Sequence, residues 1–254
     1  MTQATTADLE VSLAQDEADL RAAQRLRYEV FVAELGGGGP LVDHDARLER
    51  DHLDPLFDHL LLRDRRTGEV VGVYRLMRRD RADEAGGFYS ASEYDLQPLL
   101  CSGRRILELG RSCLHPAYRG GTAMHVLWSA LARYVAEHGI EVLFGVASFH
   151  GTDVSKLAQP LSLLHHRHLA PPALRVRALE NSFQTMNLVP EVDLDRRAAM
   201  VQIPSLIKAY LRLGGCVGEG AFVDTDFNTV DVCLIMDTAQ LSARQVRIYG
   251  GATV

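Results

Sequence analysis

The feature that most constrains the fold is a predicted strand that enters a helix through a glycine-containing turn. Residues 105–114 (RILELGRSCL) have the apolar content of a buried strand, and residues 122–138 have the apolar spacing of a helix that ends at a glycine. Residues 119–121, Arg-Gly-Gly, precede that helix. The first N–H groups of a helix have no partners inside it, so this turn predicts an anion-binding site. We therefore expect mixed strands and helices, with an anion cradle after a central strand.

The other apolar runs fit a mixed α/β fold with one central sheet. Asp16 is the expected N-cap of a first helix with Asp19 at N3, and a run of glycines ends that helix. Two hairpin-like pairs are expected, one turning near residues 65–68 and one near residues 226–228. Strands are expected at residues 9–13, 59–62, 70–77, 105–114, 141–149, 218–224 and 228–237, helices at residues 17–33, 122–138, 155–166 and 204–213, and loops at residues 41–55 and 78–103.

Composition excludes several classes of protein. The chain has 254 residues and a formal charge of -6, so binding of nucleic acid by the whole surface is not expected. The four cysteines, Cys101, Cys113, Cys216 and Cys233, form no CxxC pair, and we expect no metal site. Neither a signal peptide nor a long uncharged apolar run is present, which favours a cytoplasmic protein. No linker interrupts the chain, so we expect one domain at 1–254, with a core at about 8–237 and a tail at 238–254.

Glu108 is the candidate general base. Strict alternation would place Arg111 on the opposite face of the strand, but Gly110 is typical of a β-bulge, and one extra residue would bring Arg111 to the side of Glu108. A bulge would also splay the strand and free backbone N–H groups near residues 112–114, where an oxyanion could be stabilised. The alternative is a purely structural ion pair between Glu108 and Arg111.

The turn Arg119-Gly120-Gly121-Thr122-Ala123-Met124 is similar to the pyrophosphate-binding turn of the GCN5-related N-acetyltransferase (GNAT) superfamily, although Thr122 stands where that family has a glycine. Within the superfamily the chain resembles the L-ornithine Nα-acyltransferases. The resemblance covers about residues 8–237 and is carried by stretches that include RLRYEVFVAELGG, DHLDPLFDHLLL, ELGRSCLHPAYRGG, LFGVASFHGTD and FVDTDFNTVDVCLIMD. Residues 27–31 and the Glu108/Arg111 strand also resemble acyl-homoserine-lactone synthases.

The resemblance implies a GNAT-like single domain, with a mixed, mostly antiparallel central sheet flanked by helices and a splayed, bulged central strand. It also implies transfer of a 3-hydroxyacyl group from acyl carrier protein to the α-amine of L-ornithine, which gives lyso-ornithine lipid. No tightly bound cofactor is expected, since the donor is a phosphopantetheine thioester of the carrier protein or of CoA. The alternatives are an acyl-homoserine-lactone synthase, another GNAT enzyme that uses acyl-CoA, and a non-catalytic binding module.

The resemblance and the residue chemistry together give three sets of candidate residues. Ser112 and Cys113 are also open as acyl-enzyme nucleophiles, but no base and orienting group are spaced around them, so direct attack is favoured. The catalytic candidates are Glu108, Arg111 and Ser112; the donor-binding candidates are Leu114, Arg119, Gly120, Gly121, Thr122 and Ala123; the substrate-binding candidates are Arg27, Phe31, Asp51, Arg75 and Asp153.

An acidic carrier protein calls for a positive surface, and 25 of the 27 basic residues are arginines. We expect an arginine cluster beside the active-site strands to attract the carrier. Its candidates are Arg63, Arg65, Arg66, Arg78, Arg79, Arg81, Arg104 and Arg105. Because the implied product is a lipid, peripheral contact with the inner membrane is also expected.

Overall fold

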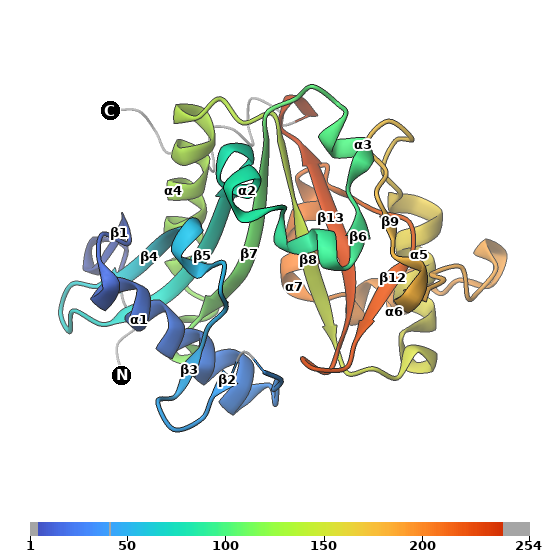
Figure 1. Cartoon of the computed structure of the whole chain (residues 1–254). Helices are drawn as coiled ribbons and strands as arrows, with labels where there is room; N and C mark the ends of the chain where they lie inside the picture. The colour runs from blue at the N-terminus through green and yellow to red at the C-terminus, as the bar shows by residue number, and fades with distance from the viewer. Residues whose placement is uncertain (1–4, 41, 241–254) are drawn as a thin grey trace. The chain divides into compact units, whose positions relative to one another are not determined.

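The computed structural model describes residues 5–40 and 42–240, which fall into two compact units (Figure 1). The first unit contains residues 5–86, apart from residue 41, and residues 109–139. The second contains residues 87–108 and 140–240. Strand β7 (Ile106–Leu114) contributes its first three residues to the second unit and the rest to the first.

The strands of the first unit follow the order β1 (Leu9–Leu13), β4 (Asp58–Asp64), β5 (Val70–Arg78) and β7. Strand β4 pairs antiparallel with both β1 and β5, and the turn between β4 and β5 closes the predicted hairpin. The elements are β1 (Leu9–Leu13), α1 (Glu17–Arg27), β2 (Val42–Asp43), β3 (Leu48–Glu49), β4 (Asp58–Asp64), β5 (Val70–Arg78), α2 (Arg79–Ala85) and α4 (Ala123–Glu137), with 3-10 turns at Thr6–Asp8, Asp54–Leu56 and Pro116–Tyr118.

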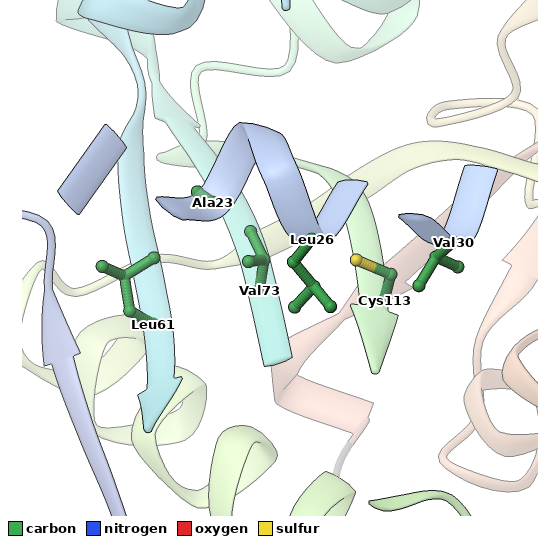
Figure 2. Close-up of a cluster of buried hydrophobic side chains, with 6 residues drawn as sticks. All are labelled: Ala23, Leu26, Val30, Leu61, Val73 and Cys113. Carbon is green, nitrogen blue, oxygen red and sulfur yellow. The ribbon is translucent and has the colours of Figure 1, made fainter. Parts of the chain in front are cut away.

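Helix α1 begins where the sequence predicts, because the Asp16 side chain accepts a hydrogen bond of 2.9 Å from the Asp19 N–H. After Arg27 the helix continues as a π-helix, Tyr28–Glu34, and this wider turn was not predicted. One face of this helical segment packs on the sheet (Figure 2), in a cluster with strand residues of β4, β5 and β7. The cluster is Ala23, Leu26, Val30, Leu61, Val73 and Cys113.

Helix α4 packs against β1, β4 and β5 of the same unit. Residues 59–62 of β4 and residues 71–77 of β5 are buried without alternation. Such runs are typical of strands covered on both faces. In Figure 1, α1 lies in front of these strands and α4 behind them.

The second unit is built around a long antiparallel pair. Strand β8 (Val142–His150) pairs with β13 (Thr229–Asp237) over its whole length, and with Ile106–Glu108 of β7 in parallel. β13 in turn pairs with β12 (Ala221–Asp224) and β11 (Cys216–Val217), and β12 pairs with β10 (Phe183–Gln184). The remaining elements are β6 (Tyr94–Asp95), α3 (Gln97–Leu100), α5 (Ala158–His168), β9 (Arg177–Ala178), α6 (Arg196–Gln202) and α7 (Ser205–Arg212), with 3-10 turns at Tyr89–Ser92, Val154–Leu157, Glu180–Ser182, Glu191–Asp193 and Thr238–Gln240.

The predicted fold class is confirmed. β7 and β8 run parallel, whereas the other strand pairs of this sheet for which a register is described are antiparallel. The predicted loops were wrong in part, because residues 41–55 include the β2–β3 hairpin and residues 78–103 include α2 and α3. The single-domain assignment stays a prediction, and residues 241–254 of the predicted tail lie outside the described residues. No helix in the described ranges is long and apolar enough to cross a membrane.

Candidate active site

A buried network of charged side chains occupies the first unit. Arg27 donates from Nε to Glu49 and from Nη1 to Asp54, the latter at 2.7 Å. Both acids and the arginine are almost completely buried. Gln24 donates a further hydrogen bond of 2.9 Å to Asp54. Burying an ion costs several kcal/mol unless a partner is in place, so these contacts are required for this packing.

Arg75 joins the network from β5. Its Nη1 lies 2.6 Å from Asp51 and 2.9 Å from Asp54, and its guanidinium covers the ring of Phe57 at 4.0 Å. Arg27 and Arg75 were predicted to bind substrate. In the structure the side chains of both arginines are at most 1% exposed and hold carboxylates of the chain itself. These contacts hold the acids in place, and substrate binding by Arg27 and Arg75 stays a prediction.

Arg111 is the least buried arginine of the network. Its Nε donates to Glu49 at 3.2 Å, its Nη2 lies 3.7 Å from Asp51, and its side chain is 11% exposed. The residue has φ of 49°, in the left-handed region that a non-glycine residue rarely adopts. This irregularity follows Gly110, where the sequence predicts a bulge, and the side chain reaches the network from β7.

The charges of the network shift the pKa values of Asp54 and Glu49. Burial would raise the pKa of Asp54, but Arg27 and Arg75 outweigh it and hold that pKa well below its usual value of 3.8. Burial likewise opposes ionisation of Glu49, yet Arg111 and Arg27 keep its pKa below the usual value. Within this network three arginines balance three carboxylates.

A cavity of about 690 Å³ that is broadly open to solvent lies in the same unit, and Asp51 is among the residues that line it. That volume is within the range of small-molecule sites. Asp51 therefore connects the cavity to Arg75 and Arg111. The other lining residues are Pro40, Val42, Asp43, His44, Asp45, Arg50 and His52.

Glu108 is held by three donors in the second unit. The N–H of Ser90 donates to its Oε1 at 2.6 Å and the N–H of Tyr89 to its Oε2 at 2.9 Å, while the Ser90 hydroxyl donates to Oε1 at 2.5 Å. Glu108 is only 2% exposed. The donors fix the orientation of this carboxylate, as a base acting on a bound amine requires.

Ser112 and Cys113 occupy different surroundings on β7. Cys113 is part of the core cluster of Figure 2, and burial raises the pKa of its thiol to about 12. A thiol with this pKa is not a nucleophile at neutral pH. The Ser112 hydroxyl is buried and has no hydrogen-bond partner among the described residues, so no base activates it. Both observations favour direct attack over an acyl-enzyme.

The predicted anion cradle precedes α4. Gly120 has φ of 75°, and the side chain of Thr122, the N-cap residue, makes no capping hydrogen bond to the helix that starts at Ala123. The side chain of the N-cap residue therefore satisfies none of the first N–H groups of this 15-residue helix. Arg119 donates to the carbonyl oxygen of Leu114 at 3.1 Å and, through both terminal nitrogens, to Glu34 at 2.6 and 2.7 Å.

These residues fit the phosphate of a phosphopantetheine arm. The chemistry of the donor set is that of an anion site, namely backbone N–H groups with one arginine. In this structure both terminal nitrogens of Arg119 are already bound to the Glu34 carboxylate, so a phosphate there would have to displace it. Phe31, which was predicted to bind substrate, lies on the same π-helix as Glu34. Its side chain is partly buried and packs against the core cluster.

Asp153, which was predicted to bind substrate, has partners close to it in the sequence. It belongs to the second unit, where it caps the 3-10 turn Val154–Leu157, accepts hydrogen bonds from Ser155 and pairs with Lys156 at 3.1 Å. This exposed arrangement is that of a local cap.

A second group of acids was not found from the sequence. Glu93, Asp224 and Asp231 place carboxylate oxygens within 4.8 Å of one another in the second unit. Oxygen ligands at this spacing suit hard cations such as Ca²⁺ or Mg²⁺. Their separation along the chain hid the cluster from motif analysis.

The arginine cluster predicted to attract a carrier protein is largely neutralised. Each member has an acidic partner within 4.0 Å in its own unit, so the set presents little free positive charge. The pairs are Arg63–Asp19, Arg65–Glu10, Arg66–Asp64, Arg78–Asp80, Arg79–Asp83, Arg81–Glu84, Arg104–Asp237 and Arg105–Glu141.

Residues 26–129 match the acetyltransferase (GNAT) domain family. The L-ornithine N(alpha)-acyltransferase of Rhodobacter capsulatus is 62% identical over 245 residues, which cover 94% of each chain. The enzyme of the same name from Brucella abortus is 41% identical, with 95% of this chain and 89% of the other covered. The chain belongs to the L-ornithine Nα-acyltransferase family. It is therefore an N-acyltransferase with a GNAT fold.

Solved structures agree with the fold of this family member. The CoA-dependent acyl-homoserine lactone synthase MesI aligns with a TM-score of 0.51 at 16% identity, covering 96% of this chain and 97% of the other. BjaI, another such synthase, solved with SAM and isopentyl-CoA, aligns with a TM-score of 0.50 at 15% identity, covering 92% and 81%. At sequence identities this low, these structural alignments establish a shared fold and nothing more.

The sequence indicated Asp54 only as one of three acids that could hold an ammonium group, with Asp51 and Asp153, and it missed Glu49, Ser90 and Glu34. Glu49 and Asp54 lie in a stretch predicted as a charged loop, and Ser90 lies in one predicted as irregular. The only available signal was the apolar neighbourhood of Arg27 and Arg75, since a buried arginine requires a buried acid. For Ser90 and Glu34 the sequence carries no such signal.

We expect Asp54→Asn to reduce the free energy of unfolding by about 3–5 kcal/mol at pH 7, because Arg27 and Arg75 lose a buried partner. The pKa of Asp54 is depressed in the folded state, so its stabilisation is present above about pH 5 and is lost as the pH falls below the usual value of 3.8. Urea unfolding at pH 7 and pH 3 should show the difference from wild type shrinking at pH 3. Asp83→Asn, at an exposed ion pair, is the control, and a pH-independent difference would contradict the assignment.

We expect Cys113→Ala to retain the acyl-transfer kcat within about twofold while lowering the free energy of unfolding by about 1 kcal/mol, since the thiol only fills the core. Cys101→Ala is the control, because Cys101 is exposed. Alkylation of the native protein should modify Cys101 and spare Cys113. A loss of turnover in a folded Cys113→Ala protein would reinstate covalent catalysis.

Proposed function

We propose that this protein transfers a 3-hydroxyacyl group from the phosphopantetheine thioester of acyl carrier protein to the α-amine of L-ornithine, giving lyso-ornithine lipid. The observation that carries the proposal is the full-length, 62% identical relative named for ornithine acylation. The oriented Glu108 carboxylate and the uncapped start of α4 supply the chemistry that such a transfer needs.

Glu108 is the proposed general base. The α-amine of an amino acid is mostly protonated at neutral pH and cannot attack until a proton is removed. In the proposed step, Glu108 accepts that proton directly or through a water molecule, and the amine nitrogen then forms a bond to the thioester carbon. Ser90 is a positioning residue, because it donates to the carboxylate and does not reach the substrate in this scheme.

The amino acid is proposed to bind through opposite charges in the first unit. Arg111 is the partly exposed arginine of the network and is assigned to the ornithine carboxylate. Asp51 lines the cavity and is assigned to an ammonium group. Arg27 and Arg75 hold Asp51 and Asp54 in place for this purpose.

The donor is proposed to bind with its phosphate at residues 119–123 and its thioester along the end of β7. N–H groups near Ser112 to Leu114 stabilise the oxyanion that forms on the thioester carbonyl. The tetrahedral intermediate then collapses and the C–S bond breaks, and the leaving thiolate takes up the second proton that the nitrogen loses. Since a free thiol has a pKa near 8.5, a separate general acid is optional. The product is an amide.

The proposed cellular location of the enzyme follows from the chemistry of its product. A soluble, cytoplasmic protein that makes an acylated amino acid releases an amphiphile, so peripheral contact with the inner membrane is part of the proposal.

Crossing two acyl acceptors with two donors tests the function. Ornithine or S-adenosylmethionine is combined with 3-hydroxyacyl carrier protein or 3-hydroxyacyl-CoA, and products are identified by mass spectrometry. We expect N-acylornithine from ornithine, at least tenfold faster with the carrier protein. Turnover confined to S-adenosylmethionine would instead indicate lactone synthesis, and equal rates with CoA would remove the carrier specificity.

Glu108→Gln tests the mechanism. We expect kcat to fall by about 10²–10⁴-fold, the usual range for a general base, with little change in the KM for the carrier. Ser90→Ala should lower kcat less, with recovery in Ser90→Thr, which keeps the hydroxyl. Glu137→Gln, at an exposed position on α4, is the matched control. Unchanged turnover in Glu108→Gln would exclude Glu108 as the base.

A further inference from the structure

Exposed apolar side chains are concentrated in one segment of the second unit. Among the described residues, five large apolar side chains are exposed, and all but Leu35 lie between residues 188 and 201. Val192 is 91% exposed and Val201 is 73% exposed. Single exposed apolar residues are ordinary, but a concentration of them marks an interaction surface. The set is Leu188, Val192, Met200 and Val201.

The segment is held together by local contacts. Glu191 in the 3-10 turn pairs with Arg196 at the start of α6, at 3.8 Å, and with Arg167 of α5, at 2.5 Å. α6 in turn packs against α5. The segment that carries Val192 is thereby joined to the start of the helix that carries Met200 and Val201.

Two cations flank the apolar side chains. Arg197 lies one helical turn before Val201 on α6, so the two side chains are neighbours on its exposed surface. Lys208 of α7 donates from its ammonium group to the Val201 carbonyl at 3.1 Å. For Arg197 and Lys208 the structure gives no acidic partner within residues 5–40 and 42–240. The eight arginines of the expected carrier cluster are all paired with acids, so these two cations differ from them.

We propose that Leu188, Val192, Met200 and Val201, with Arg197 and Lys208, form a surface that docks on the headgroup region of an anionic membrane. We call these six residues the docking surface. Val192 and Val201 are the two most exposed of these apolar side chains, and a fluid interface accepts exposed apolar side chains without a matching shape. Arg197 and Lys208 complement anionic lipid headgroups. Of the acids in the same segment, Glu191 is paired with Arg167 and Arg196 and Asp195 caps α6, while Asp193 is exposed beside Val192.

The proposal deepens the peripheral membrane contact proposed above and depends on no particular acyl donor or acceptor. It names the part of the chain that carries that contact. Docking there would place the enzyme at the membrane that receives an acylated product.

Sedimentation of the full-length protein with lipid vesicles tests the proposal. Vesicles of phosphatidylcholine mixed with phosphatidylglycerol are compared with vesicles of phosphatidylcholine alone. We expect binding to the mixed vesicles that weakens as salt is added, and much weaker binding to phosphatidylcholine. No sedimentation with the mixed vesicles would overturn the proposal.

Two double variants separate the apolar and the charged contributions. Val192→Ser with Val201→Ser should lower the partition coefficient about tenfold, because two side chains no longer enter the apolar boundary. Arg197→Gln with Lys208→Gln should lower it about 30-fold on the mixed vesicles and change it little on phosphatidylcholine. The matched controls are Leu35→Ser and Arg133→Gln, exposed residues of the first unit, which should bind as wild type.

Other occupants of the docking surface give distinct results. If the variants raise the KM for acyl carrier protein and leave vesicle binding intact, the surface docks the carrier and the proposal is wrong. If light scattering shows a dimer that the variants dissociate, the surface joins two copies and the proposal is likewise wrong. Acyl transfer without vesicles should be unaffected, so failure of the proposed acyl transfer and failure of membrane docking are separately visible.

Discussion

The first unit depends on a buried set of three arginines and three carboxylates whose charges cancel. Each ion alone would cost several kcal/mol to bury, and the set is tolerable only when every partner is present and aligned. The members come from α1, β3, β5, β7 and the chain between β3 and β4. The network therefore fixes these segments relative to one another, and it also builds the cavity wall at Asp51.

The backbone of β7 serves the same arrangement. A non-glycine residue in the left-handed region costs of order 1–2 kcal/mol, and Arg111 adopts it where its side chain meets Glu49 and Asp51. The strand before this point carries Glu108, which is bound by donors from Tyr89 and Ser90. β7 thus supplies both the proposed base and the proposed carboxylate-binding arginine, and each is oriented by contacts within its own unit.

The long elements were predictable because their periodicity is strong. Strands near residues 70–77 and 141–149 and the helix near residues 122–138 bury continuous apolar faces, and they form close to where the pattern placed them. The β2–β3 hairpin, α2 and α3 were missed because such short elements hold too few apolar residues to show a period. The π-helix at Tyr28–Glu34 differs from an α-helix in its i→i+5 hydrogen bonds, such as the one from the Leu35 N–H to the Val30 carbonyl at 3.2 Å, and the apolar pattern does not encode that difference.

The sequence by itself determined the fold class, the family and the chemical candidates, since these follow from local patterns and from motifs such as residues 108–123. Only the tertiary structure decided which arginines are enclosed and which is partly exposed. Arg27, Arg75 and Arg111 have the same charge, but the acids they meet lie 22, 24 and 62 positions away along the chain. Burial and charge compensation depend on distances in space, and no local pattern encodes distances between residues so far apart.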